Sequence, residues 1–319
     1  MGANATSLAS GTPMLAAACA RFLGIPHTFT VDVVVIVIWT GIFTTSVTLG
    51  LKKGIKVLSD INVVLVMVIC SFILVIGPTW FIVNNFTNSM GIMTSEFFKM
   101  AFYTDPVAKS MFPQWWTVFY WAWYFAYAPY MGAFIARISK GRTFKEVAFG
   151  VIMGGSLGCW VFHAIFGGNA LYNQINGLFD FGGVLSSSGD AAAIVGSLMV
   201  LPGSSILLIL FIFVGFVYSA TTIDSSAYTM ASVSSKDISG DAEPAWWNRM
   251  FWALMLGGLA LVVMNIGGLV PIKTTSLVVA FPILIFVMVA LVSMNRWLKE
   301  DKPHLDKATG NEDDRINLA

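Results

Sequence analysis

The segment WTVFYWAWYFAYAPYMGAFIARISKGR, residues 116–142, is long enough and apolar enough to cross a bilayer before it ends in positive charge. Most apolar helices are built from Leu, Val and Ile, so this density of aromatic rings needs an explanation. The rings either pack against neighbouring helices or line a site for a ligand that aromatic faces bind. Both explanations place the segment in a membrane.

The composition of the whole chain agrees with a membrane protein. Of the 319 residues, 57% are hydrophobic and only 11% are charged, whereas a soluble domain carries about 25% charge. The net charge of +1 argues against a nucleic-acid partner. The three cysteines have no metal-ligand spacing, and no catalytic motif is present. We therefore expect no enzyme, no cofactor and no metal site, sodium as a coupling ion excepted.

Apolar runs of about 20 residues predict an all-α polytopic membrane protein. The seven predicted spans lie near residues 32–51, 61–83, 116–136, 146–167, 205–230, 248–270 and 275–297. A weaker apolar stretch near 13–26 precedes them. Residues 168–194 are rich in Gly, Asn and Ser and are predicted to form an ordered loop.

The basic residues predict the orientation, because Lys and Arg gather in cytoplasmic loops. Fourteen of the eighteen lie in or next to alternate loops and the tail 298–319: Lys52, Lys53, Lys56, Arg137, Lys140, Arg142, Lys145, Lys236, Arg249, Arg296, Lys299, Lys302, Lys307 and Arg315. We therefore expect a multi-pass protein of the cell inner (plasma) membrane with a cytoplasmic C-terminus.

The rings of the opening segment repeat with a helical period. Trp116, Tyr120, Trp123 and Tyr127 stand at i, i+4, i+7 and i+11, and Tyr124 lies at the edge of the same face. Aromatic faces attract weakly hydrated cations, and quaternary ammonium ions suit them best. The alternative is a belt at the membrane border or simple helix packing. The residues alone leave both open.

A polar patch interrupts the fifth span. The segment VYSATTIDSSAYT, residues 217–229, contains Asp224 and several hydroxyl side chains. The oxygens of Thr221 and Thr222 suit a small hard cation such as sodium. Alternatively, the hydroxyls bond to carbonyls of their own helix and Asp224 approaches its cytoplasmic end. On the residues alone, the second interpretation is favoured.

The longer segment FYTDPVAKSMFPQWWTVFYWAWYFAYAPYMGAFIARISKGRT, residues 102–143, closely resembles the signature of the betaine/choline/carnitine transporter (BCCT) family. The resemblance extends over nearly the whole chain through the segments LGIP, KGIKVLSD, YSATTIDSS and GGLVPIKTT. The sequence is most similar to the carnitine/γ-butyrobetaine antiporter branch of the family. The family implies a homotrimer of twelve-helix subunits with two inverted (LeuT-like) repeats. This chain resembles helices six to twelve, so we expect a fragment that lacks the N-terminal helices, with 13–26 a remnant before helix six.

The resemblance also assigns roles to substrate-binding residues. Trp123 and Tyr124 match two adjacent tryptophans of the family's central aromatic box, with Tyr124 departing from the pattern. Trp116 and Tyr120 match an outer vestibule site of the carnitine branch.

Other positions that match the family indicate which ion is coupled to transport. Thr221 and Thr222 match a hydroxyl pair that contributes to a sodium site in sodium-coupled members, and Tyr218 stands where these often have Phe. Sodium-independent antiporters carry an arginine at the position of Asn62. Because Asn62 is uncharged and the threonines are present, the resemblance favours sodium coupling.

We therefore expect a secondary transporter of a trimethylammonium solute such as glycine betaine, choline or carnitine. A sodium-independent carnitine/γ-butyrobetaine-type antiporter is one alternative. Another is a truncated, non-transporting membrane fragment or a partner subunit. A membrane enzyme or receptor would need a catalytic or signalling element that the short tail does not provide.

Overall fold

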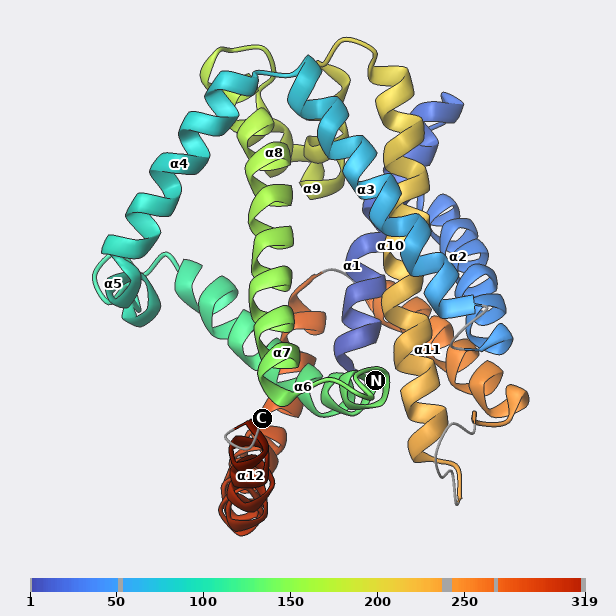
Figure 1. The fold of residues 1–319 in the computed structure, drawn as a ribbon. Helices are drawn as coiled ribbons and strands as arrows, with labels where there is room; N and C mark the ends of the chain where they lie inside the picture. The colour runs from blue at the N-terminus through green and yellow to red at the C-terminus, as the bar shows by residue number, and fades with distance from the viewer. Residues whose placement is uncertain (1, 51–53, 237–242, 267–268, 317–319) are drawn as a thin grey trace.

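The computed structural model describes residues 2–50, 54–236, 243–266 and 269–316, and in these ranges every regular element is a helix (Figure 1). The ends of the predicted spans 32–51 and 248–270, Lys52, Lys53 and the last residues of the tail fall partly or wholly outside the described residues. In chain order the elements are α1 Gly2–Leu23, α2 Phe29–Leu49, α3 Lys56–Ile76, α4 Thr79–Ser95, α5 Phe97–Phe102, η2 Gln114–Val118, α6 Phe119–Ile138, α7 Phe144–Phe149, η3 Gly150–Gly154, α8 Gly155–Ile175, α9 Phe181–Met199, α10 Ser204–Val233, α11 Trp246–Ile266 and α12 Leu269–Ile316.

Six helical stretches of the described chain are long and apolar enough to cross a membrane: Phe29–Leu49, Lys56–Ile76, Phe144–Ile175, Ser204–Val233, Trp246–Ile266 and Leu277–Trp297. They overlap six of the seven predicted spans and confirm the all-α polytopic fold class. The remaining prediction, 116–136, is helical as η2 and α6. It is absent from the six because its Trp, Tyr and Pro residues lower its hydropathy.

The helix predicted at 61–83 ends earlier than its apolar run. The α3 helix stops at Ile76, and α4 starts after Pro78. Proline has no backbone N–H to donate and disfavours helical geometry in the residue before it, so Gly77 and Pro78 together separate the two helices.

The prediction of a loop over residues 168–194 is wrong. The α8 helix continues to Ile175, and most of the rest forms α9. The Asp180 side chain caps α9 by accepting a hydrogen bond of 3.0 Å from the Gly183 N–H. Glycine and serine indicate loops in water, but small residues allow close helix packing in a membrane. Here α9 packs against α1 and α8.

The apolar stretch predicted at 13–26 is the second half of a longer helix at the centre of the bundle. The α1 helix packs against α2, α9, α10 and α11, and Leu8, Leu15 and Ala18 are fully buried or nearly so. Its small residues permit this close approach. A Cβ added to Gly11 would lie 3.4 Å from the Trp39 ring of α2.

Hydrogen bonds between helices reinforce this packing. The Trp39 indole N–H of α2 donates to the Phe216 carbonyl of α10 at 2.7 Å. The Ser46 hydroxyl of α2 donates to the Asp224 carboxylate of α10 at 2.6 Å. Because lipid is as apolar as the side chains, helices in a membrane associate through van der Waals packing and such bonds.

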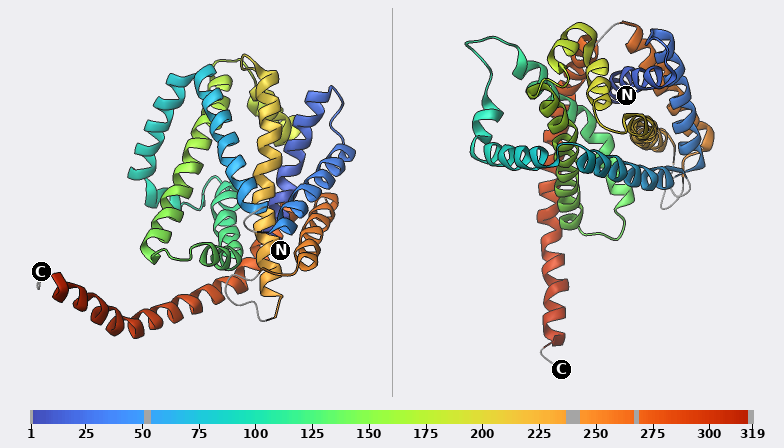
Figure 2. Two further views of the ribbon diagram at one scale, coloured as in Figure 1. Left: turned by 45° about the vertical axis from the view of Figure 1, so that its right-hand side comes forward. Right: turned by 90° about the horizontal axis from the view of Figure 1, so that it is seen from above.

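The views of the ribbon show how the elements lie in space. The α3 helix packs against both α8 and α10, and α4 packs against α8. The C-terminal part of α12 extends away from the other helices, which gather into one bundle (Figure 2). The α6 helix contacts α1, α10 and α12.

Adjacent glycines of α11 provide a test of this packing. A Cβ at buried Gly257 would lie 2.7 Å from Cγ2 of Thr40 on α2, whereas nothing lies within 4 Å of a Cβ at Gly258. We expect Gly257→Val to destabilise the protein by about 1–3 kcal/mol, the usual cost of overpacking, and to lower its melting temperature in detergent. Gly258→Val is the matched control and should melt close to the wild type. Equal melting of the two variants would contradict the α2–α11 contact.

Candidate functional site

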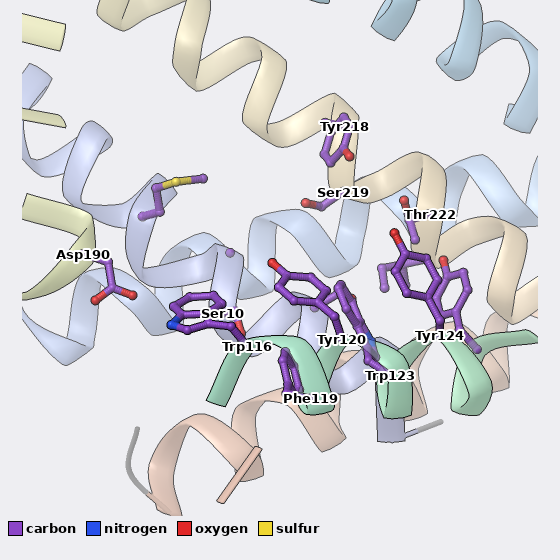
Figure 3. Close-up of a pocket in the computed structure, with 15 residues that line it drawn as sticks. Ser10, Trp116, Phe119, Tyr120, Trp123, Tyr124, Asp190, Tyr218, Ser219 and Thr222 are labelled. Carbon is purple, nitrogen blue, oxygen red and sulfur yellow. The ribbon is translucent and has the colours of Figure 1, made fainter. Parts of the chain in front are cut away.

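A cavity of about 480 Å³ lies between α1, α6, α9 and α10 (Figure 3). This volume is within the usual range for small-molecule sites. Its lining consists of Ser7, Ser10, Gly11, Met14, Trp116, Phe119, Tyr120, Trp123, Tyr124, Tyr127, Asp190, Tyr218, Ser219, Thr222 and Ile223. All five ring residues that the sequence placed on one helix face are among them.

The rings form a continuous wall along η2 and α6. Trp116 and Tyr120 stack with an interplanar angle of 23° and centroids 6.1 Å apart. Trp123 follows at 5.8 Å from Tyr120, and Tyr127 meets Trp123 edge-on at 6.4 Å. Their mutual contacts restrict the rotation of each ring, so the wall is formed before any ligand arrives.

The start of the aromatic helix is irregular. Residues Gln114–Val118 form a π-helical turn before α6 begins, and such turns occur frequently at functional sites. The Gln114 side chain also donates to the Thr104 carbonyl at 3.0 Å. The π-helical turn and this hydrogen bond set the position of Trp116 in the row of rings.

Asp105 organises the loop before that turn. Its carboxylate accepts hydrogen bonds from the N–H groups of Ser110 at 2.7 Å and Ala108 at 3.2 Å, and from the Tyr103 hydroxyl at 2.9 Å. The bonds with Ser110, followed by the one from Tyr103, hold the pKa of Asp105 below its usual range. The carboxylate therefore stays ionised and keeps the loop folded at neutral pH.

The α10 hydroxyls divide into two groups. Thr221 donates to the Tyr218 carbonyl at 2.7 Å, and Ser225 and Ser226 each donate to carbonyls one turn back at 2.8 Å. These three follow the interpretation that the hydroxyls bond to their own helix. The Thr222 hydroxyl makes no hydrogen bond within the described chain and lines the cavity. The structure therefore separates the predicted pair.

Asp224 lies inside the helical bundle, against the last turn of α2. Its side chain is fully buried and accepts from Ser46 and Ser225 at 2.6 and 3.3 Å. Two hydroxyl donors inside the bundle compensate for the loss of water around the carboxyl group.

Two predicted ion-site residues lie differently with respect to the cavity. Tyr218 lines it, next to Ser219 and Thr222. Asn62 belongs to α3, which packs against α10, but it is not among the cavity residues. Its side-chain oxygen is shielded from solvent and has no hydrogen-bond partner in the described part of the chain.

Several lining residues were missed by the sequence analysis. Ser7, Ser10, Gly11 and Met14 follow helical spacing on one face of α1, and that period was visible in the sequence. Asp190 belongs to α9, in the segment predicted as a loop, and no local signal pointed to it. Within the described residues, no group of three or more His, Cys, Asp and Glu side chains is placed to hold a metal ion.

Comparison with known proteins decides the family. A sequence model of the betaine/carnitine/choline transporters matches residues 1–303. The chain belongs to this BCCT family. Members of the BCCT family are transporters and not enzymes, and the multi-pass membrane architecture agrees with that class.

A curated BCCT-like relative is similar over most of this chain. The uncharacterized transporter YeaV of Escherichia coli strain K12 is 33% identical over 302 residues, which are 94% of this chain and 63% of the relative. The chain thus spans less than two thirds of that relative's length.

The cavity can be tested with a thiol reagent that carries a trimethylammonium group. In a background with Cys19, Cys70 and Cys159 replaced by alanine, we expect Ser219→Cys to react rapidly, because this position lines the cavity. Ser226→Cys, on the same helix but fully buried, is the control and should react slowly. Labelling is followed by mass spectrometry. Equally slow labelling at both positions would show that the cavity is closed to the reagent.

Proposed function

We propose that this chain provides the aromatic wall of a secondary transporter for a trimethylammonium solute such as glycine betaine, choline or carnitine. The observation that carries the proposal is the row of rings that lines a cavity of about 480 Å³ beside α1 and α10. Membership of the BCCT family supports the same solute class. Transport is proposed for the whole protein, to which this chain contributes.

The chemistry of the lining suits this solute. A trimethylammonium group is positively charged but cannot donate a conventional hydrogen bond, so it gains little from polar acceptors. An aromatic face attracts such a cation by about 0.5–2 kcal/mol, depending on how far the contact is desolvated. We assign the head group to Trp123 and Tyr124, with Tyr127 beside them, and an outer subsite to Trp116 and Tyr120.

The charge distribution supports an orientation in the membrane. Arg137 lies in the last turn of α6, so the Trp123 end of the wall is nearer the cytoplasm and Trp116 nearer the outside. By the same rule, the C-terminus lies in the cytoplasm. The plasma membrane is the proposed location of the protein. A homotrimer is the proposed assembly.

Sodium is the proposed coupling ion. The unbonded Thr222 hydroxyl in the cavity wall is the oxygen donor that this chain offers, with Tyr218 one turn earlier. Thr221 is engaged with its own helix and supports the site less directly. Asn62 has no charge to replace a cation, which favours sodium coupling over sodium-independent antiport.

Two tryptophans of one helix test solute binding. We expect Trp123→Ala to weaken choline and glycine betaine binding by at least about tenfold, because desolvated cation–π contacts supply energies of this order. Trp121→Ala is the matched control: Trp121 is 59% exposed and does not line the cavity. Binding to the purified full-length protein is measured with radiolabelled solutes. Unchanged binding in Trp123→Ala would remove the proposed function.

The two threonines test the coupling ion. We expect Thr222→Ala to raise the sodium concentration needed for half-maximal uptake in proteoliposomes, because a hydroxyl oxygen is lost from the cavity wall. Thr221→Ala should have the smaller effect. Uptake that does not depend on sodium in the wild type would instead favour the antiporter alternative.

A further inference from the structure

Among the described residues, a single carboxylate faces the aromatic cavity. Among the fifteen residues that line it, all within the described chain, only Asp190 carries a charge at neutral pH. Gly189, with φ 83° and ψ 176°, interrupts α9 immediately before it. Only glycine adopts this backbone conformation readily, and the break starts a new helical segment at Asp190.

The Asp190 carboxylate stands at one end of the row of rings. In Figure 3 it lies near Trp116 and Ser10, while Tyr124 and Thr222 lie at the opposite end. Trp116 and Tyr120, the stacked pair, lie between the carboxylate and Trp123. With the orientation proposed above, Asp190 marks the outer end.

A second cavity, of about 460 Å³, meets the first at this point. Ser10, Met14 and Asp190 line both of them. The second cavity also contains His27 and Asp32, whose Nε2 and Oδ1 atoms are 2.7 Å apart. Asp32 is therefore already paired with His27, whereas no hydrogen bond or ion pair within the described chain engages the Asp190 side chain. Asp190 is the carboxylate left for a solute.

We propose that Asp190 is a specificity-determining residue, which makes the cavity prefer trimethylammonium solutes of net positive charge over zwitterions. This inference rests on the proposed function and narrows its solute class. The rings bind the ammonium group of both kinds of solute alike. A zwitterion, however, brings its own carboxylate into a cavity where the one charged side chain among the described residues is negative, and like charges repel there. A cation such as choline has no such opposing group.

The expected size of the preference is modest. Asp190 is exposed, so water and salt screen its field. We expect choline to bind roughly three- to tenfold more tightly, relative to glycine betaine, than it does after the charge is removed. An uncharged residue here should leave the rings and their affinity for the ammonium group in place.

The experiment measures the ratio of choline to glycine betaine affinity in the purified full-length protein by radioligand binding. Asp190→Asn and Asp190→Ser should both lower the ratio roughly three- to tenfold, because the carboxylate of glycine betaine then no longer meets a like charge. Asp190→Glu keeps the charge and should keep the preference. Glu96→Gln removes a carboxylate that pairs with Lys99 at 3.1 Å and does not line the cavity. This matched control should leave the ratio unchanged.

The outcomes separate this inference from the proposed function. If Trp123→Ala abolishes binding of both solutes while neither neutral Asp190 variant changes the ratio, the Asp190 inference is overturned and the proposed function stands. If Glu96→Gln lowers the ratio as much as Asp190→Asn does, surface charge in general sets the preference and the inference is again overturned. If the wild type binds neither solute, the proposed function and the Asp190 inference are both overturned.

Discussion

The buried hydrogen bond from Ser46 to Asp224 sets the rotation of α10, and much of the cavity depends on it. A carboxyl group without partners in a membrane interior is costly, so α10 turns the fully buried Asp224 toward α2. Residues two apart on a helix point about 200° away from each other. With Asp224 fixed on one side, Thr222 faces the other, where the rings of α6 stand. One polar contact thus orients the face that lines the site.

The α1 helix supplies the complementary surface. Its alanines and glycines let α2, α9, α10 and α11 approach closely, and its Ser7 and Ser10 then reach the cavity. Tyr130 of α6 donates to the Asn4 side chain of α1 at 2.9 Å, which ties the aromatic helix to this centre. The aromatic helix is therefore tied to the small-residue helix that lines the same cavity.

The sequence predicted what local periodicity determines. Trp116, Tyr120, Trp123 and Tyr127 share a face because their spacing is helical, and the spans follow from apolar runs. Tertiary context decided the rest. Gly and Ser in α9 indicate a loop by composition but form a helix when packed on α1. Thr221 and Thr222 are neighbours of one residue type, yet only Thr222 lines the cavity, because the helix points them about 100° apart. Asp190 joins the site through a contact that no local pattern encodes.

Aromatic rings and charged side chains recognise different parts of a solute. A quadrupole attracts any weakly hydrated cation with little regard to its orientation, so a wall of Trp and Tyr identifies an ammonium group and ignores what is attached to it. Discrimination among solutes that share this group requires polar or charged atoms placed where the solutes differ. The described cavity offers the hydroxyls of its serines, its tyrosines and Thr222, and the Asp190 carboxylate. Hydroxyls can donate as well as accept, so they tolerate either kind of solute. A carboxylate only accepts and is negatively charged, which is why we assign the distinction between a cation and a zwitterion to Asp190.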